Sequence, residues 1–254
     1  MELGELIDHF RTVYLDDVSN QVDGQPDELF GHESIVRLFQ AGQDEFARKT
    51  WCIVDDEQAA ICTINLDLDA TNNNANYTGE QLVPYSPKII KVIRARFSDS
   101  DVPIALTGFG YSELRWFPTA GNLRPFDVNV VSSLTSGRPA SIFFDSDSVR
   151  MKFDRPLDAS TSALDLIMRV VRKPITALTS DDLEASPEIP EDYHLALCEF
   201  VGKELLKGPN IDADGRQLRA NYAQNWQARI VEGKREMRRR MQGPIGWRFG
   251  AWAA

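Results

Sequence analysis

Cysteine and histidine are scarce in this sequence, with three of each among 254 residues. Cys52, Cys62 and Cys198 are odd in number, widely spaced and set in apolar surroundings, which predicts free thiols in a reducing compartment rather than disulfides. The sequence also lacks a nucleophile elbow, a P-loop, a dinucleotide fingerprint and any Cys/His zinc spacing. We therefore expect no enzyme activity, no cofactor and no metal site.

Long apolar runs and positive charge are also lacking. No run approaches the length that crosses a membrane, and the acidic, amphipathic stretch ELGELIDHFRTVYLDD is unlike a signal or transit peptide. Lys and Arg number 28 against 38 Asp and Glu, a formal net charge of −10. Phosphate binding needs clustered cations, so this balance disfavours a protein that grips nucleic acid over a broad face. We expect no membrane contact.

Acidic clusters offer the remaining catalytic alternative. They occur at residues 16–17, 55–57 and 180–182. Each falls in a predicted turn, where solvated or capping carboxylates are the simpler interpretation. Glu191 and His194 have the Glu-x-x-His spacing of carboxylate-bridged di-iron bundles, but the second copy that such a site needs is missing. A carboxylate-dependent hydrolase that uses acids such as Asp181 and Glu191 is the weakest alternative.

Apolar residues at helical spacing predict helices near both ends of the chain. The first carries Leu3, Leu6, Ile7, Phe10, Val13 and Tyr14 on one face, and a second spans residues 32–49. A third begins in PEIPEDYH, with Pro190 at the first helical position, where a missing N–H costs nothing. A long fourth helix spans residues 214–242.

Between these helices the residues are typical of strands. CIVDDEQAAICTINLDLD alternates from Ile61, and four further β-rich segments are bounded by Pro, Gly, Ser or Asp. They are KIIKVIRARFS, PIALTGFGYSELRWF, ASIFFDSDSVRMKFDRP and SALDLIMRVVRKP. FDSDSV predicts a hairpin turn, and local up-and-down pairing of about five antiparallel strands is the simplest topology.

The order of elements predicts an α+β fold, because helices from both ends of the chain must meet to bury their apolar stripes. We expect a helical bundle formed by residues 1–49 and 175–242, with an inserted antiparallel β module at residues 50–174. Residues 243–254 are expected to form a C-terminal docking tail.

The C-terminal segment KREMRRRMQGPIGWRFGAWAA is basic and aromatic on an acidic chain. Arginine at a helix end and a solvated terminus are the plain interpretation. Exposed aromatic residues beside arginine, in a segment too rich in glycine to form its own core, are instead typical of interface anchors. The docking candidates are Arg238, Arg239, Arg240, Trp247, Arg248, Phe249 and Trp252. A nucleic-acid-binding module that uses the Arg-rich helix is the alternative.

Four segments, taken in order, carry a resemblance to a known family. They are LIDHFRTVYLDD, ESIVRLFQAGQDEFARK, SGRPASIFFDSDSVRMKFDRPLDASTSALDLIMRVVRKP and PEIPEDYHLALCEFVGKELL. Followed by the long basic helix, they resemble the head-to-tail adaptor (neck) proteins of tailed bacteriophages, and the layout is similar to the tail tubular protein A group of short-tailed phages. Residues 98–131 depart from the pattern, and no role is assigned to them.

The resemblance implies a structural virion protein of the head-to-tail interface, made in the host bacterial cytoplasm, without enzyme activity or cofactor. It implies a homo-oligomeric ring, a dodecamer, between the portal protein and a tail nozzle or fibre protein, with an axial channel through which DNA passes without specific binding. The seven docking candidates would then contact the portal. A ring of acidic subunits repels passing DNA, which agrees with that role.

Overall fold

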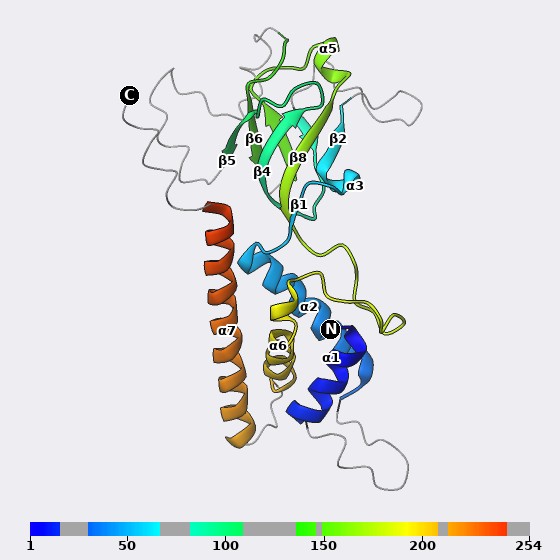
Figure 1. Ribbon diagram of the computed structural model, residues 1–254, viewed down its shortest axis with the longest axis vertical. Coiled ribbons are helices and arrows are strands. Elements are labelled where there is room, and N and C mark those ends of the chain that lie inside the picture. Colours follow the sequence, from blue (N-terminus) through cyan, green and yellow to red (C-terminus); the bar gives the residue numbers. More distant parts are fainter. Residues whose placement is uncertain (16–29, 67–81, 109–135, 146–148, 208–212, 243–254) are drawn as a thin grey trace, which may run out of the picture. The chain divides into compact units, whose positions relative to one another are not determined.

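The computed structural model describes residues 1–15, 30–66, 82–108, 136–145, 149–207 and 213–242 (Figure 1). The chain divides into two compact units. The helical unit comprises Met1–Ile53 with Lys173–Ala254, and the β unit comprises Val54–Arg172. The predicted α+β class is confirmed. Independent folding of the β unit as an insertion stays a prediction.

The helical unit has one hydrophobic core to which all of its long helices contribute. Its elements are α1 (Leu3–Phe10), the π-helix η1 (Arg11–Leu15), α2 (His32–Thr50), the 3-10 turn η4 (Glu191–Tyr193), α6 (Ala196–Leu205) and α7 (Ala213–Gln242). The predicted bounds of α2 and α7 are correct to within one residue, because their apolar residues recur at the spacing that keeps one face turned to the core.

Helices α6 and α7 run antiparallel and approach closely. Tyr193, just before α6, bonds Glu236 near the end of α7, whereas Gly202 near the end of α6 meets Tyr222 in the first half of α7. A Cβ atom at Gly202 would lie 2.6 Å from Cδ2 of Tyr222, a distance that side chains do not tolerate. Glycine at this position therefore lets the two helices pack face to face.

Two expectations about the helices are wrong in detail. Val13 does not face the core but is 61% exposed, because the chain changes at Arg11 from α-helix to π-helix, which shifts the phase of the apolar stripe. Pro190 is not the first residue of a long helix. It precedes η4 with an extended backbone, φ −55° and ψ 140°, and α6 begins only at Ala196.

The β unit contains two four-stranded sheets around a second hydrophobic core. Its elements are β1 (Val54–Asp55), α3 (Ala59–Cys62), β2 (Thr63–Asn65), β3 (Leu82–Pro84), β4 (Ile89–Phe97), β5 (Ala105–Gly108), β6 (Ser141–Asp145), β7 (Arg150–Phe153), α5 (Ala159–Ser162) and β8 (Asp165–Arg172). In the first sheet β8 pairs antiparallel with β1, β2 and β4. The second has the order β3-β7-β6-β5.

Local up-and-down pairing of about five strands is therefore the wrong topology. Strand β8 pairs with strands far from it in sequence, and β5 pairs parallel to β6 with Ala105 opposite Ser141. The hairpin predicted at FDSDSV is confirmed, since β6 and β7 are antiparallel neighbours. Ile61 and Cys62 lie in α3 rather than in a strand.

A buried ion pair joins two strands of the first sheet. Nε of Arg172 donates to Oδ2 of Asp55 at 2.6 Å, and both side chains are buried. Oδ1 of Asp55 also accepts the backbone N–H groups of Glu57 and Gln58 at 3.0 and 3.2 Å, which turns the chain toward α3. Asp55 is therefore not solvated, although its bonds to these two N–H groups agree with the capping interpretation.

Candidate functional site

The sequence-predicted docking residues fall in two groups. Arg238, Arg239 and Arg240 are exposed at the C-terminal end of α7. Trp247, Arg248, Phe249 and Trp252 lie outside the described residues, as do the tail at residues 243–254 and most of the unassigned stretch 98–131. The structure therefore locates the basic half of the predicted site.

Only one of these arginines has an ion-pair partner within the described ranges. Arg240 pairs with Glu236, which also accepts a hydrogen bond from the Tyr193 hydroxyl at 2.7 Å. The bond from Tyr193, together with the charge of Arg240, lowers the pKa of Glu236. Glu236 is thus a fixed anion that holds the last turns of α7 against η4, while Arg238 and Arg239 point into solvent.

A groove of about 800 Å³ lies along the solvent side of α7. Its lining residues are Tyr193, Gln224, Gln227, Ala228, Val231, Glu232, Arg235, Glu236 and Arg239. Ala228 and Val231 make an apolar floor, and Arg235 and Arg239 place positive charge at one end. The sequence predicts Arg239 as part of a site but does not predict the groove. The α7 residues that line the groove recur at three- and four-residue spacing, which places them on one face of the helix.

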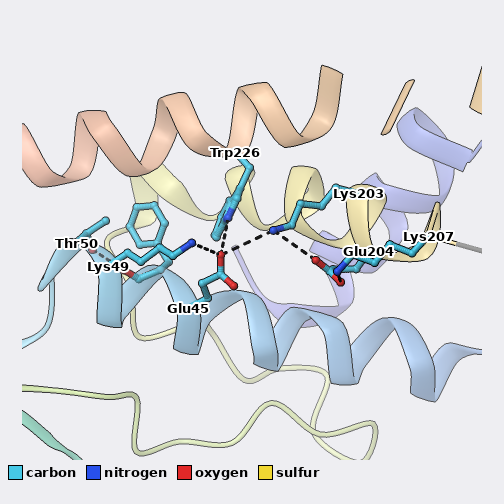
Figure 2. Close-up of polar contacts among 8 residues, drawn as sticks. Glu45, Lys49, Thr50, Lys203, Glu204, Lys207 and Trp226 are labelled. Atoms are coloured by element: carbon cyan, nitrogen blue, oxygen red, sulfur yellow. Dashed lines mark hydrogen bonds and ion pairs between the residues drawn. The ribbon is translucent and has the colours of Figure 1, made fainter. Parts of the chain in front are cut away.

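Trp226 fixes the helix that carries the groove (Figure 2). Its ring is 2% exposed and packs against the rings of Phe46 and Phe200, with centroid distances of 5.6 and 5.1 Å. Its Nε1–H donates to Oε1 of Glu45 at 3.1 Å. One side chain of α7 therefore contacts both α2 and α6.

Two lysines complete the polar contacts around Glu45. Nζ of Lys49 lies 2.8 Å and Nζ of Lys203 lies 3.8 Å from Oε1 of Glu45. Burial alone would raise the pKa of Glu45, but the hydrogen bonds from Lys49 and Trp226 and the charge of Lys203 outweigh it and lower the pKa. Figure 2 shows that these groups converge from three helices on a single carboxylate.

Two glutamines of α2 hold the chain between β8 and η4. Oε1 of Gln40 accepts the N–H of Leu178 at 2.7 Å. Gln43 is fully buried; its Nε2 donates to the carbonyl of Thr176 at 3.4 Å, and its Oε1 accepts the N–H of Glu188 at 3.3 Å. These side chains supply hydrogen-bond partners to a segment that has no regular secondary structure.

Replacing Gln43 with leucine is expected to lower the free energy of unfolding of the helical unit by about 1–3 kcal/mol, because it removes the bonds of a fully buried amide to two part-buried backbone groups. Urea denaturation followed by far-UV circular dichroism measures this. Gln40 is half-buried on the same helix, so Gln40→Leu is the comparison variant. It should lower the free energy of unfolding by less. Equal stability of Gln43→Leu and the wild-type protein would contradict the role assigned to this side chain.

In the part of the chain that the structure describes, the residues named for the hydrolase and metal alternatives lie apart from any catalytic group, and Asp181 is exposed. Glu191 is exposed and pairs with the N-terminal amine of Met1 at 3.4 Å. His194 is buried, 2.9 Å from the carbonyl of Ile189 and 3.3 Å from the same amine. Within the described ranges, no group of three or more His, Cys, Asp and Glu side chains is placed to hold a metal ion.

Cys52, Cys62 and Cys198 are free thiols, as expected. Burial raises the pKa of Cys52 and Cys62 to about 11, which suits unreactive thiols. None of the helices that the structure describes has the length and apolar character required to cross a bilayer.

Residues 1–248 match a family described as SU10 adaptor protein. The match spans the helical unit, the β unit and α7 with its groove. No curated protein matches the chain.

Proposed function

Because this chain belongs to the SU10 adaptor protein family, a family of phage head-to-tail adaptors, we propose that it assembles as a homo-oligomeric ring between the portal and the tail. The observation that carries the proposal is the family match, which extends over both units. A structural role in the bacteriophage virion follows from that membership. The ring is a dodecamer around an axial channel, and a tail nozzle or fibre protein is the partner on the far side.

The charge of the chain supports passage of DNA rather than its capture. Each copy carries a formal net charge of −10, and repetition around a ring gives a strongly negative collar. Like charge repels the phosphate backbone, so DNA moves through such a channel without being held. The alternative of a nucleic-acid-binding module depends on the same exposed arginines of α7, but the family membership favours the adaptor.

We assign portal docking to the end of α7 and the tail that follows it. Arg238 is exposed there and has no ion-pair partner among the residues that the structure covers. Trp247, Phe249 and Trp252 follow within a short stretch of sequence. Aromatic anchors with arginine are the residues that most often dominate binding energy at interfaces. Repetition around the ring multiplies a weak contact through avidity.

Truncation before Gly243 is expected to leave the melting temperature nearly unchanged but to abolish incorporation into particles. The reason is that the core contacts of α7 come from Trp226, Ile230 and Met237, which the truncation keeps. Incorporation is measured by immunoblotting purified particles for this protein and dividing its signal by that of the portal protein. A matched variant keeps the full tail and replaces only Trp247, Phe249 and Trp252 by serine; it should fail in the same way. Normal incorporation of the truncated chain would refute tail docking.

The proposed function is tested with phage that lacks the gene for this chain, with and without complementation in trans. Without the protein, electron microscopy should show filled or emptied heads that carry a portal but no tail. With it, antibody labelling should mark the neck. Tailed, infectious particles in the absence of the protein would overturn the adaptor role.

A further inference from the structure

Two exposed surfaces of the helical unit carry charges of opposite sign. Lys234, Arg235, Arg238 and Arg239 lie exposed on the C-terminal half of α7, and none of them forms an ion pair with another described residue. Residues 181–184, with the sequence DDLE, are exposed as well and carry Asp181, Asp182 and Glu184. We call these four residues the acidic loop. Glu232 and Glu236 line the same groove, but they pair with Arg229 and Arg240, so the four cations keep their positive charge.

Each surface also has an apolar centre. Val231 is 39% exposed in the floor of the α7 groove, beside Ala228. Leu183 is 41% exposed in the middle of the acidic loop. A leucine surrounded by carboxylates matches a shallow apolar floor with arginines at one end, both in polarity and in charge.

The acidic loop is held in place by backbone hydrogen bonds to α1. The N–H of Gly4 donates to the carbonyl of Leu183, and the N–H of Leu3 donates to the carbonyl of Ala185, both at 2.9 Å. The loop is thus fixed before any partner arrives, which reduces the entropy cost of docking.

The two surfaces lie on different sides of the helical unit. Figure 1 shows α2 and α6 between α7 and α1, in agreement with the packing of α2 against α6, α7 and α1. The acidic loop is bonded to α1, and the groove opens on the solvent side of α7. One copy therefore cannot place its own acidic loop in its own groove.

We propose that the α7 groove of one copy binds the acidic loop of the next copy, and that this contact builds the ring. Leu183 lies on Ala228 and Val231, and the acids of the loop pair with Arg235 and Arg239. A contact between two different surfaces of identical chains is heterologous, and it closes into a ring when the rotation between copies allows it. The inference rests on the proposed function and specifies the interface within it.

Other occupants fit the groove less well. The tail at residues 243–254 contains Arg248 and no acid, so the arginines at the groove would repel it. An acidic segment of the portal would match the charge, but it would leave the acidic loop without a partner. A second copy satisfies both surfaces with one contact.

Charge reversal tests the pairing. Arg235→Glu with Arg239→Glu, and separately Asp181→Lys with Asp182→Lys, should each reduce the number of copies per particle by at least about tenfold, because like charges then face each other. Combining all four substitutions should restore a large part of the loss. Arg216→Glu with Arg219→Glu makes the same charge change on α7 outside the groove and should have little effect. Unchanged melting temperatures confirm folding.

Cross-linking tests the contact directly. In particles, Leu183→Cys combined with Val231→Cys should give a ladder of multimers with a bis-maleimide reagent, whereas each single variant gives no ladder beyond that of the native thiols. Leu218 is 40% exposed on the same helix but outside the groove. Leu218→Cys combined with Leu183→Cys is therefore the matched control and should give no ladder.

The outcomes separate the interface from the function. If wild-type protein is absent from the neck, the proposed function fails. If wild-type protein is present and the reversed variants are incorporated normally, the adaptor role stands and the interface is overturned. A cross-link from Val231→Cys to the portal protein, or to the tail of another copy, likewise overturns the interface. Rescue by the fourfold charge swap together with the copy-to-copy ladder supports it.

Discussion

Replacing Trp226 with alanine is expected to lower the free energy of unfolding of the helical unit by about 3–5 kcal/mol, the cost of removing a fully buried large side chain. The ring of Trp226 lies between Phe46 of α2 and Phe200 of α6 and is also 5.6 Å from Nζ of Lys203. Its loss leaves a cavity at the junction of three helices. It also removes one of the hydrogen bonds that compensate the half-buried carboxylate of Glu45.

Trp226→Phe separates these contributions, because phenylalanine keeps most of the ring but has no N–H to donate. It should cost about 1–2 kcal/mol, the sum of a lost hydrogen bond and a small cavity. Urea denaturation followed by far-UV circular dichroism measures both variants. A loss below about 1 kcal/mol for the alanine variant would show that α7 is held by other contacts.

The second large effect is expected in the β unit. Arg172→Met should destabilise it by about 3–5 kcal/mol, because the variant leaves the Asp55 carboxylate buried without its cation. Arg169→Met is the matched control on the same strand. Arg169 and Asp56 are both more than half exposed and 3.8 Å apart, so this change should cost less than about 1 kcal/mol. Equal losses for the two variants would show that the buried pair has no special role.

The same pair predicts a pH dependence. Burial alone would raise the pKa of Asp55, but the hydrogen bonds from Arg172 and from the backbone of Glu57 and Gln58 outweigh it and lower the pKa. An acid whose pKa is lower in the folded state stabilises above its unfolded value of about 3.9 and loses that contribution as the pH falls through the folded value. Wild-type protein should therefore lose stability below about pH 4, and Arg172→Met should lose less over the same range.

Sequence periodicity predicts the helices well but leaves the pairing of strands open. In α7, Leu218, Tyr222, Trp226 and Ile230 recur by fours, so the helix follows from local spacing. Trp226 and Ile230 lie in the core as expected, whereas Leu218 is 40% exposed. Alternation in a strand shows which side chains share a face, but not which strand lies beside it. The parallel pairing of β5 with β6, and the central place of β8, depend on contacts between distant segments.

The polar residues of the interior were the hardest to predict. Gln43, Asp55 and Arg172 look like surface residues, because burial of such groups is rare unless they are paired. Besides local partners, each has one more than a hundred residues away in the sequence: Thr176 and Glu188 for Gln43, and Arg172 for Asp55. Only the folded chain shows that each polar group is satisfied.

The candidate site was predicted in part. Charge clustering identified the arginines at the end of α7, because a run of like charge is visible in the sequence alone. The groove depends on Tyr193, which comes from a turn of a distant segment and reaches Glu236 on α7. Which side of a helix stays uncovered is decided by its neighbours, and the spacing of Ala228, Val231 and Arg235 shows only that they share a face.

The pairing of β1 with β8 brings the two ends of the β unit close together, which affects how this unit could be replaced in evolution. The β unit begins at Val54 and ends at Arg172, and Val54 lies opposite Val171 in the antiparallel ladder. The chain therefore enters and leaves this unit at points about 5 Å apart, the spacing of paired strands. Another sheet domain whose N- and C-termini lie close together could therefore be inserted at these two junctions. The segments that join it to the helical unit would not need to be longer. If the β unit folds independently, as predicted, we expect recombination to exchange it as a cassette while the helical unit keeps its sequence.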